Sequence, residues 1–195
     1  MDIKIKIYNC MITRLDIFRK KQVFEKVYTN YILSNHMFEQ INENVQTTER
    51  TEVLELLENS DLKATPQEFL DSINKSKHKE MLSDYSIDEL SKMDLYKVPG
   101  YNIGYALKRD GDGVDIVSVH NNEPGIKGIG KDLIKSAIKN GGNKLDHFDI
   151  EPLSTIYSDM GFVEVERYPY DPQYDEDGSF ARKYGKLDVV YRKLK

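Results

Sequence analysis

Three glycines in a short loop, Gly125, Gly128 and Gly130, mark the part of the sequence best suited to binding an anion. Glycine adopts positive φ without strain and lets a ligand approach the backbone. Apolar residues at helical spacing follow the loop, namely Leu133, Ile134, Ala137 and Ile138, so the loop opens the first turn of a helix. Unpaired N–H groups and the helix dipole attract an anion, and Lys127 and Lys131 add positive charge. A tight turn that holds no ligand is the alternative.

A tyrosine further along the chain, Tyr157, is followed by Gly161 and Phe162 at the end of a second predicted helix. One interpretation of Tyr157 is a core tyrosine on the inner face of that helix.

Regular elements on both sides would position the loop and the tyrosine. Asp115–His120 alternates as a strand before the loop, and Asn140–Asn143 stops the first helix with a C-cap signal. Residues 144–148 follow as a short strand, Pro152 opens the second helix, and residues 163–168 alternate as another strand. The predicted order is strand, loop, helix, strand, helix, strand.

This order and its motifs resemble the acyl-CoA-binding segment of the GNAT superfamily of N-acyltransferases. In that family a strand leads into a Gln/Arg-x-x-Gly-x-Gly/Ala loop, and a later helix ends in Tyr-x-x-x-Gly-Phe. The residues that match in order and spacing are Val119-His120, Gly128-Ile129-Gly130 and Tyr157-x-x-x-Gly161-Phe162. The resemblance covers about residues 101–195.

The resemblance implies where an acyl-CoA would bind. In the family the pyrophosphate of CoA rests on the loop amides, the pantetheine arm lies in a splay between two strands, and the tyrosine protonates the departing thiolate. Carried over, Tyr157 becomes the acid, and a strand amide near Val117 to Val119 polarises the thioester carbonyl. The implied binding positions are Val117, Val119, Ile126, Lys127, Gly128, Ile129, Gly130 and Lys131.

The chain departs from the family pattern in three places. Gly125 stands where the family usually has Gln or Arg, which weakens the expected grip on the phosphates. The segment between His120 and Gly128 is slightly longer than usual. The family's frequent Asn near the start of the last helix is missing, with Asp149 and Ile150 in that neighbourhood.

The sequence does not assign the base that takes the proton from an amine. His120 and Glu123 lie closest to the expected cleft in the sequence, and water can carry the proton instead. His147 between Asp146 and Asp149 suggests a metal site, but further ligands at suitable spacing are missing. A structural role for His147 is therefore favoured, and no metal site is predicted.

Further strands and an acidic loop complete the C-terminal half. Tyr101–Leu107 reads as a strand, Arg109–Gly113 as a hairpin turn, and residues 187–191 as the closing strand. The segment before the closing strand is rich in carboxylates, with Asp171, Asp175, Glu176 and Asp177. These carboxylates could attract an amine acceptor; the alternative is a mobile acidic surface loop.

The N-terminal half has helical signals and no residue of catalytic type. Alternating Ile and Lys at residues 3–7 predict an opening strand, and helices are predicted over residues 13–34 and 46–59. Capping boxes at Thr65–Glu68 and Ser86–Glu89 begin two more helices. Lone His36 and the basic run from Lys75 to Glu80 are read as structural features.

Composition excludes several classes of protein. The 195 residues, 39% hydrophobic and 31% charged, are typical of a soluble globular chain. No stretch approaches the ~20 apolar residues of a membrane span, and the N-terminus lacks a signal-peptide core. The single cysteine, Cys10, excludes an internal disulfide and is expected to be buried. A net charge of −5 argues against broad nucleic-acid binding.

The sequence therefore predicts a mixed α/β fold, with a mostly antiparallel sheet flanked by helices in residues 98–195 and a mostly helical region in residues 1–97. The predicted function is cytoplasmic transfer of an acetyl or other acyl group from acyl-CoA to an amine of a small molecule or protein. The alternative is an inactive GNAT-like binding or assembly protein, with a protein partner held by the N-terminal helices. A phage origin would make it a virion component or an inhibitor of a host factor. A nucleotide-binding loop is disfavoured, because Gly-Lys-Ser/Thr is missing.

Overall fold

The computed structural model describes residues 3–59, 61–111 and 113–195, without the side chains of residues 3–25, 27, 28, 30, 41 and 44. Its contacts divide the chain into two compact units that meet between Thr47 and Thr48. The first unit is helical, and the second holds a sheet with its flanking helices. The predicted domain boundary between residues 97 and 98 stays a prediction, although residues 48–97 are grouped with the sheet.

A single helix, α1 (Ile3–Asn59), replaces the predicted strand and two helices at the N-terminus. The prediction of a strand at residues 3–7 is wrong. A strand needs a partner to satisfy its backbone, and none of the described strands pairs with these residues. Ile3 and Ile7 are also four residues apart, which suits one face of a helix. The predicted burial of Cys10 concerns a side chain outside the described ones.

In the part of the chain that the structure describes, six strands form one sheet in the order β1-β2-β3-β4-β6-β5. They are β1 (Asp94–Lys97), β2 (Ile103–Asp110), β3 (Gly113–Asn121), β4 (Lys144–Phe148), β5 (Phe162–Tyr168) and β6 (Val189–Leu194). All neighbouring pairs are antiparallel except β3 with β4. The predicted fold class, a mostly antiparallel sheet flanked by helices, is confirmed. β1 was not predicted.

Within the described residues, five further helices accompany the sheet. They are α2 (Pro66–Ile73), α3 (Ile87–Leu90), α4 (Gly130–Lys139), α5 (Leu153–Asp159) and α6 (Ser179–Tyr184), with 3-10 turns at Lys79–Met81 and Pro172–Tyr174. Both predicted capping boxes are confirmed, since Thr65 and Ser86 each exchange hydrogen bonds with the glutamate three residues later.

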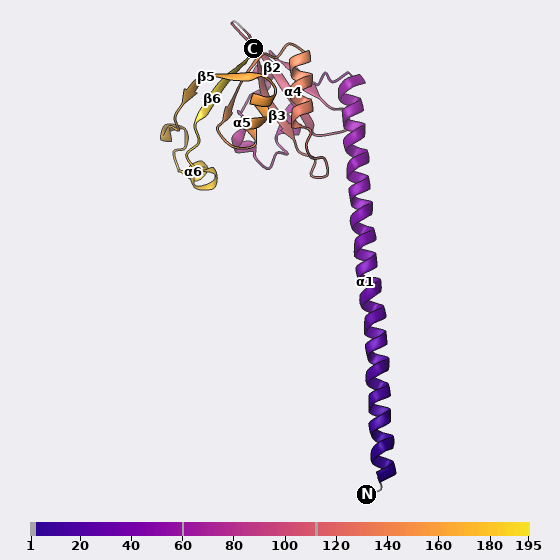
Figure 1. Ribbon diagram of the computed structural model, residues 1–195. Helices are drawn as coiled ribbons and strands as arrows, with labels where there is room; N and C mark the ends of the chain where they lie inside the picture. The colour runs from indigo at the N-terminus through magenta and orange to yellow at the C-terminus, as the bar shows by residue number, and fades with distance from the viewer. Residues whose placement is uncertain (1–2, 60, 112) are drawn as a thin grey trace. The chain divides into compact units, whose positions relative to one another are not determined.

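Apolar side chains fill both faces of the central strands. Along β2, Tyr105 belongs to the core that also holds Leu133 of α4 and Tyr157 of α5. Its neighbour Ala106 belongs to a second core with Phe69 of α2. Successive side chains of a strand point to opposite faces, so α4 and α5 cover one face and α2 and α3 the other. Figure 1 shows α4 and α5 against the sheet.

No helix in the described part of the chain is long and apolar enough to cross a membrane.

Candidate functional site

The neighbouring strands β3 and β4 separate after a single pairing position, Asp115 opposite Lys144. A cavity of about 870 Å³ opens beside them and is lined by Val117 and Val119 of β3 and by Asp146 of β4. Side chains of α4, α5 and the segment around residues 76–84 complete its walls. Ligands bind where adjacent parallel strands diverge, because backbone groups lose their partner strand there. The splay implied by the resemblance is present between β3 and β4.

The edge of β3 at this cavity carries a bulge. Ser118 has a φ of 51°, and the register with β2 shifts between Gly104 and Ala106. A bulge leaves the extra residue outside the ladder and re-aims the side chains next to it. The Ser118 hydroxyl is buried and has no hydrogen-bond partner among the described residues. Such strain concentrates at binding sites, and here it lies between the two valines that line the cavity.

The glycine loop is anchored through its apolar side chains and one amide. Ile126 and Ile129 are almost fully buried in the core between α4 and the sheet. The Asn121 side chain, at the end of β3, donates to the Ile126 carbonyl oxygen at 2.6 Å. These contacts turn the isoleucine side chains inward and leave the loop backbone to face solvent.

The backbone of the loop is open to a ligand. Gly128 has a φ of 72°, and a Cβ atom at Gly128 or Gly130 would meet nothing within 4 Å. In the described structure, the N–H groups of residues 127–131 have no acceptor. Gly130 begins α4 and also lines the cavity. The loop thus offers unpaired donors at a helix N-terminus, the arrangement that binds phosphate.

Three cationic side chains lie around the loop, and only two of them, Lys127 and Lys131, were predicted from the sequence. Lys127 is exposed, and Lys131 forms an ion pair of 2.7 Å with Asp159 at the end of α5. The third is Arg50 of α1, whose Nε donates to the Lys127 carbonyl oxygen at 3.3 Å and whose Nη2 lies 3.5 Å from Asp132. Arg50 could not be assigned from sequence, because it lies far from the loop along the chain.

Tyr157 lies on α5 and lines the same cavity as Gly130. Its ring is 9% exposed and packs against His147, with the centroids 4.9 Å apart. Its hydroxyl has no hydrogen-bond partner in the described part of the chain. Burial, together with the nearby Asp146 carboxylate, raises the pKa of Tyr157 to about 12. The phenol therefore keeps its proton at neutral pH, as a general acid must.

A buried arginine holds the histidine on which Tyr157 packs. Arg192 of β6 donates from Nε to His147 Nε2 at 2.9 Å and from Nη1 to the Ser158 hydroxyl at 3.0 Å. His147 Nδ1 lies 2.7 Å from the Phe148 carbonyl oxygen, so the proton is on Nδ1 and the ring is neutral. Burial, and next the charge of Arg192, lower the pKa of His147. The structural role predicted for His147 fits this geometry.

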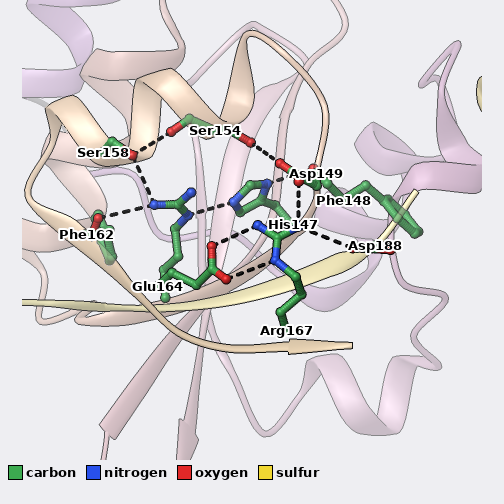
Figure 2. Close-up of polar contacts among 10 residues, drawn as sticks. His147, Phe148, Asp149, Ser154, Ser158, Phe162, Glu164, Arg167 and Asp188 are labelled. Atoms are coloured by element: carbon green, nitrogen blue, oxygen red, sulfur yellow. Dashed lines mark hydrogen bonds and ion pairs between the residues drawn. The ribbon is translucent and has the colours of Figure 1, made fainter. Parts of the chain in front are cut away.

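A second arginine ties the neighbouring loops together (Figure 2). Arg167 of β5 pairs with Asp149 at 2.5 Å, with Glu164 at 2.8 Å and with Asp188 at 3.4 Å. Asp149 also accepts a hydrogen bond of 2.7 Å from Ser154 in the first turn of α5. The network fixes the start of α5 to the ends of β4 and β6, and with it the helix that carries Tyr157.

Asp146 is a candidate base, although its sequence context suggested only a metal ligand. Asp146 is an exposed residue, and it lines the cavity. Poor solvation there raises the pKa of Asp146. Its field also raises the pKa values of Tyr157 and of Tyr191, the residue opposite it on β6. Asp146 and Tyr157 line the same cavity, so a carboxylate with a raised pKa and a protonated phenol are both present in its walls.

The two bases named from the sequence are occupied by other contacts. His120 is buried, with Nε2 2.7 Å from the Ser72 hydroxyl and Nδ1 2.9 Å from the Ser118 carbonyl oxygen. Burial lowers the pKa of His120, so the ring is neutral and fully hydrogen-bonded. Glu123 accepts from the backbone and side-chain nitrogens of Asn102 and does not line the cavity. His120 lines the cavity, but both of its ring nitrogens are engaged, and Glu123 lies outside the cavity lining.

No cluster of three or more metal-ligating side chains occurs among the described residues. Asp149 is engaged by Arg167 and Ser154, away from Asp146 in the cavity.

No protein-family model and no curated protein matches the chain. Among solved structures, the chain is similar to a Bacillus subtilis acetyltransferase in complex with CoA, with 21% identity and a TM-score of 0.44. That similarity covers 69% of this chain and 96% of the other. An IAA acetyltransferase from Bacillus cereus is also similar, with 20% identity, a TM-score of 0.40, and coverage of 67% of this chain and 92% of the other. Similarity at this level does not define an activity, which has to be argued from the site itself.

Proposed function

We propose that the chain is a GNAT-type N-acyltransferase that transfers an acetyl or other acyl group from acyl-CoA to an amine. One observation carries this proposal. A single cavity is lined by Gly130 of the glycine loop, by Val117 and Val119 at the splay, and by the Tyr157 phenol. Anion site, extended groove and acid are thus arranged in the order of a CoA pyrophosphate, its pantetheine arm and its thioester.

The pyrophosphate is assigned to the N–H groups of residues 127–131. Lys127, Lys131 and Arg50 supply the positive charge around it, because the position of the family's Gln or Arg is held by Gly125. An adjacent helix N-terminus adds the favourable field of its dipole. The contact of Arg50 with the loop supports this assignment.

The pantetheine arm is assigned to the edge of β3 beyond Asp115, where the backbone groups of the strand have lost their pairing with β4. Those groups can pair with the amides of the arm as a missing strand would. An amide in the range Val117 to Val119 then polarises the thioester carbonyl and stabilises the oxyanion.

The chemistry assigns the base to Asp146 and the acid to Tyr157. A neutral amine attacks the thioester carbonyl carbon, and its surplus proton passes to Asp146, directly or through water. The tetrahedral intermediate collapses, the C–S bond breaks, and the thiolate takes the proton of the Tyr157 hydroxyl. The products are an amide and CoA with a free thiol. Asp146 is ionised above its raised pKa, and Tyr157 is protonated below about pH 12.

Titration calorimetry with acetyl-CoA, paired with an assay of thiol release on adding amines, tests the proposal. We expect saturable binding of acetyl-CoA with one site per chain, and faster release of CoA thiol when an amine is present. Absence of heat at millimolar acetyl-CoA, with no thiol release, would remove the enzyme and leave the binding or assembly protein. A cytoplasmic location, where acyl-CoA is available, forms part of the same proposal.

A further inference from the structure

A second cavity of about 770 Å³ adjoins the first one. The two cavities share Glu80, Phe148, Tyr174 and Val189 in their walls, so they lie side by side and their junction is at these residues. Most of the second wall comes from the connection between β5 and β6 (residues 169–188). Asp146 lines the first cavity and lies opposite Tyr191, which lines the second. Asp146, the base of the proposed reaction, therefore lies near the junction of the two cavities.

Aromatic rings dominate the wall of the second cavity. Six of its fourteen lining residues are tyrosine or phenylalanine. Several of these rings pack on each other, such as Tyr168 on Tyr191 at 5.4 Å between centroids. Tyr174 is different, because it is 85% exposed and has no ring partner among the described aromatic pairs. A free tyrosine ring at the mouth shared by both cavities is placed to stack on a ligand or to face a cation.

Negative charge accompanies these rings. Asp171 and Asp175 line the second cavity and accept hydrogen bonds from neutral donors, including Gln173 and Tyr170. Glu80 contributes less, because its carboxylate is paired with Lys183. Of the residues described by the structure, no lysine or arginine lines either cavity. The acidic loop noted in the sequence thus divides into residues that face the cavity and residues, Glu176 and Asp177, that do not.

We infer that the second cavity binds the acceptor, and that the acceptor is a small amine carrying at least two positive charges; this inference rests on the proposed acyl transfer. The amine that attacks the thioester is neutral and sits at the junction, near Asp146. A second ammonium group stays protonated and lies between the Tyr174 ring and the Asp171 and Asp175 carboxylates. A volume of about 770 Å³ is within the range of small-molecule sites.

The acceptor needs two amino groups because Asp146 acts on the attacking nitrogen, whereas the rings and carboxylates of the second cavity act on the other one. The attacking nitrogen must lose its charge before attack. A monoamine then carries no positive charge that the rings and carboxylates of the second cavity could bind. A second ammonium keeps its charge throughout the reaction and gains from them in both the bound and the transition state. The N–C bond forms first and one proton goes from the amine to Asp146; the C–S bond then breaks and one proton goes from Tyr157 to the thiolate.

The test compares two acceptors with the same carbon skeleton, 1,6-diaminohexane and hexylamine, with the full chain, acetyl-CoA and the thiol-release assay. We expect kcat/KM for the diamine to exceed that for hexylamine at least about tenfold after correction for its two equivalent amines. Equal values would overturn the inference, and so would preferential acetylation of a lysine-containing peptide. Acetyl-CoA binding measured on the same sample separates these outcomes from failure of acyl transfer itself, which would overturn both proposals.

Substitutions in the second cavity test whether the preference for the diamine arises there. Tyr174→Ala and Asp171→Asn should each raise KM for the diamine by about fivefold or more and leave KM for acetyl-CoA unchanged. Tyr174→Phe keeps the ring and should keep the native KM. Glu176→Gln is the matched control, since Glu176 is in the same loop but lines neither cavity. If Tyr174→Ala and Asp171→Asn leave the diamine KM at the control value, the inference is wrong.

Discussion

At the scale of single residues, the Tyr157 hydroxyl carries the largest expected effect on rate. Tyr157→Phe removes the proton donor but keeps the ring that packs on His147. We expect turnover to fall by about 100-fold or more, in the range of general acid catalysis, while the dissociation constant of acetyl-CoA stays within about twofold. Steady-state kinetics and calorimetry on the same preparation check this. Unchanged turnover would take the acid role away from Tyr157.

Asp146 should show opposite effects on activity and stability. Its pKa is raised in the folded chain, so the folded state holds a proton that the unfolded state has released. Stability is therefore lost as the pH rises through that pKa, and Asp146→Asn should raise Tm slightly at neutral pH. The same variant should lower kcat by about 100-fold and remove the acidic limb of its pH profile. A profile that keeps the limb would show that another group is the base.

At the scale of elements, the placing of α5 depends on the buried Arg192. Arg192→Met leaves His147 Nε2 and the Ser158 hydroxyl without their donor. We expect the free energy of unfolding to drop by about 1–3 kcal/mol, the cost of leaving a buried polar group unsatisfied. Arg109→Met is the control, because Arg109 is exposed and pairs with Asp94 at the surface; it should cost less than about 0.5 kcal/mol. Denaturant titration of both variants measures the difference, and equal costs would contradict this account.

The sequence predicts those elements whose signals are local. Glycines and capping residues placed the glycine loop, α4 and α5, because a turn or cap depends on a few neighbouring residues. The capping boxes at Thr65 and Ser86 succeeded for the same reason. β1 was missed and a strand at residues 3–7 was expected instead, because strand formation depends on distant partners that local alternation does not reveal.

Less of the candidate site than of the fold could be predicted from the sequence. Gly130 and Tyr157 have motifs around them, so both could be named in advance. Asp146 and Arg50 have none, and their importance comes only from what surrounds them in space. The bulge at Ser118 could not be foreseen either, since a serine in an alternating strand gives no sign of positive φ.

At the scale of the whole molecule, two buried histidines should make stability depend on pH. Burial lowers the pKa values of His120 and His147 below their ordinary value of 6.5. Below that pH the unfolded chain takes up protons that the folded chain does not, so stability is present above pH 6.5 and is lost as the pH falls toward the folded pKa values. We expect Tm to decrease between pH 7.5 and pH 5.5, and by less in His147→Asn. Calorimetric scans at both pH values check this, and an equal decrease in the variant would exclude His147.

The compact unit from Thr48 onward contains every residue assigned to the proposed reaction. The proposed reaction depends most on one place in that unit, the anion site where the glycine loop opens α4. Replacing Gly130 by Asp tests this site, because the substitution should keep or raise the stability of the fold while it weakens the binding of acetyl-CoA. A negatively charged Asp near a helix N-terminus interacts favourably with the helix dipole and stabilises the fold. The same charge repels a bound pyrophosphate. A Cβ atom there meets nothing within 4 Å, so the side chain itself is tolerated.

The deciding measurement is the dissociation constant of acetyl-CoA, by calorimetry, for the native chain, Gly130→Asp and the uncharged control Gly130→Asn. We expect saturable binding to the native chain and to Gly130→Asn. Gly130→Asp should bind acetyl-CoA at least about tenfold more weakly than Gly130→Asn, a loss of about 1.4 kcal/mol. The Tm of Gly130→Asp should nevertheless be equal or higher. Equal affinity of Gly130→Asp and Gly130→Asn would contradict the account, because the phosphates would then lie elsewhere.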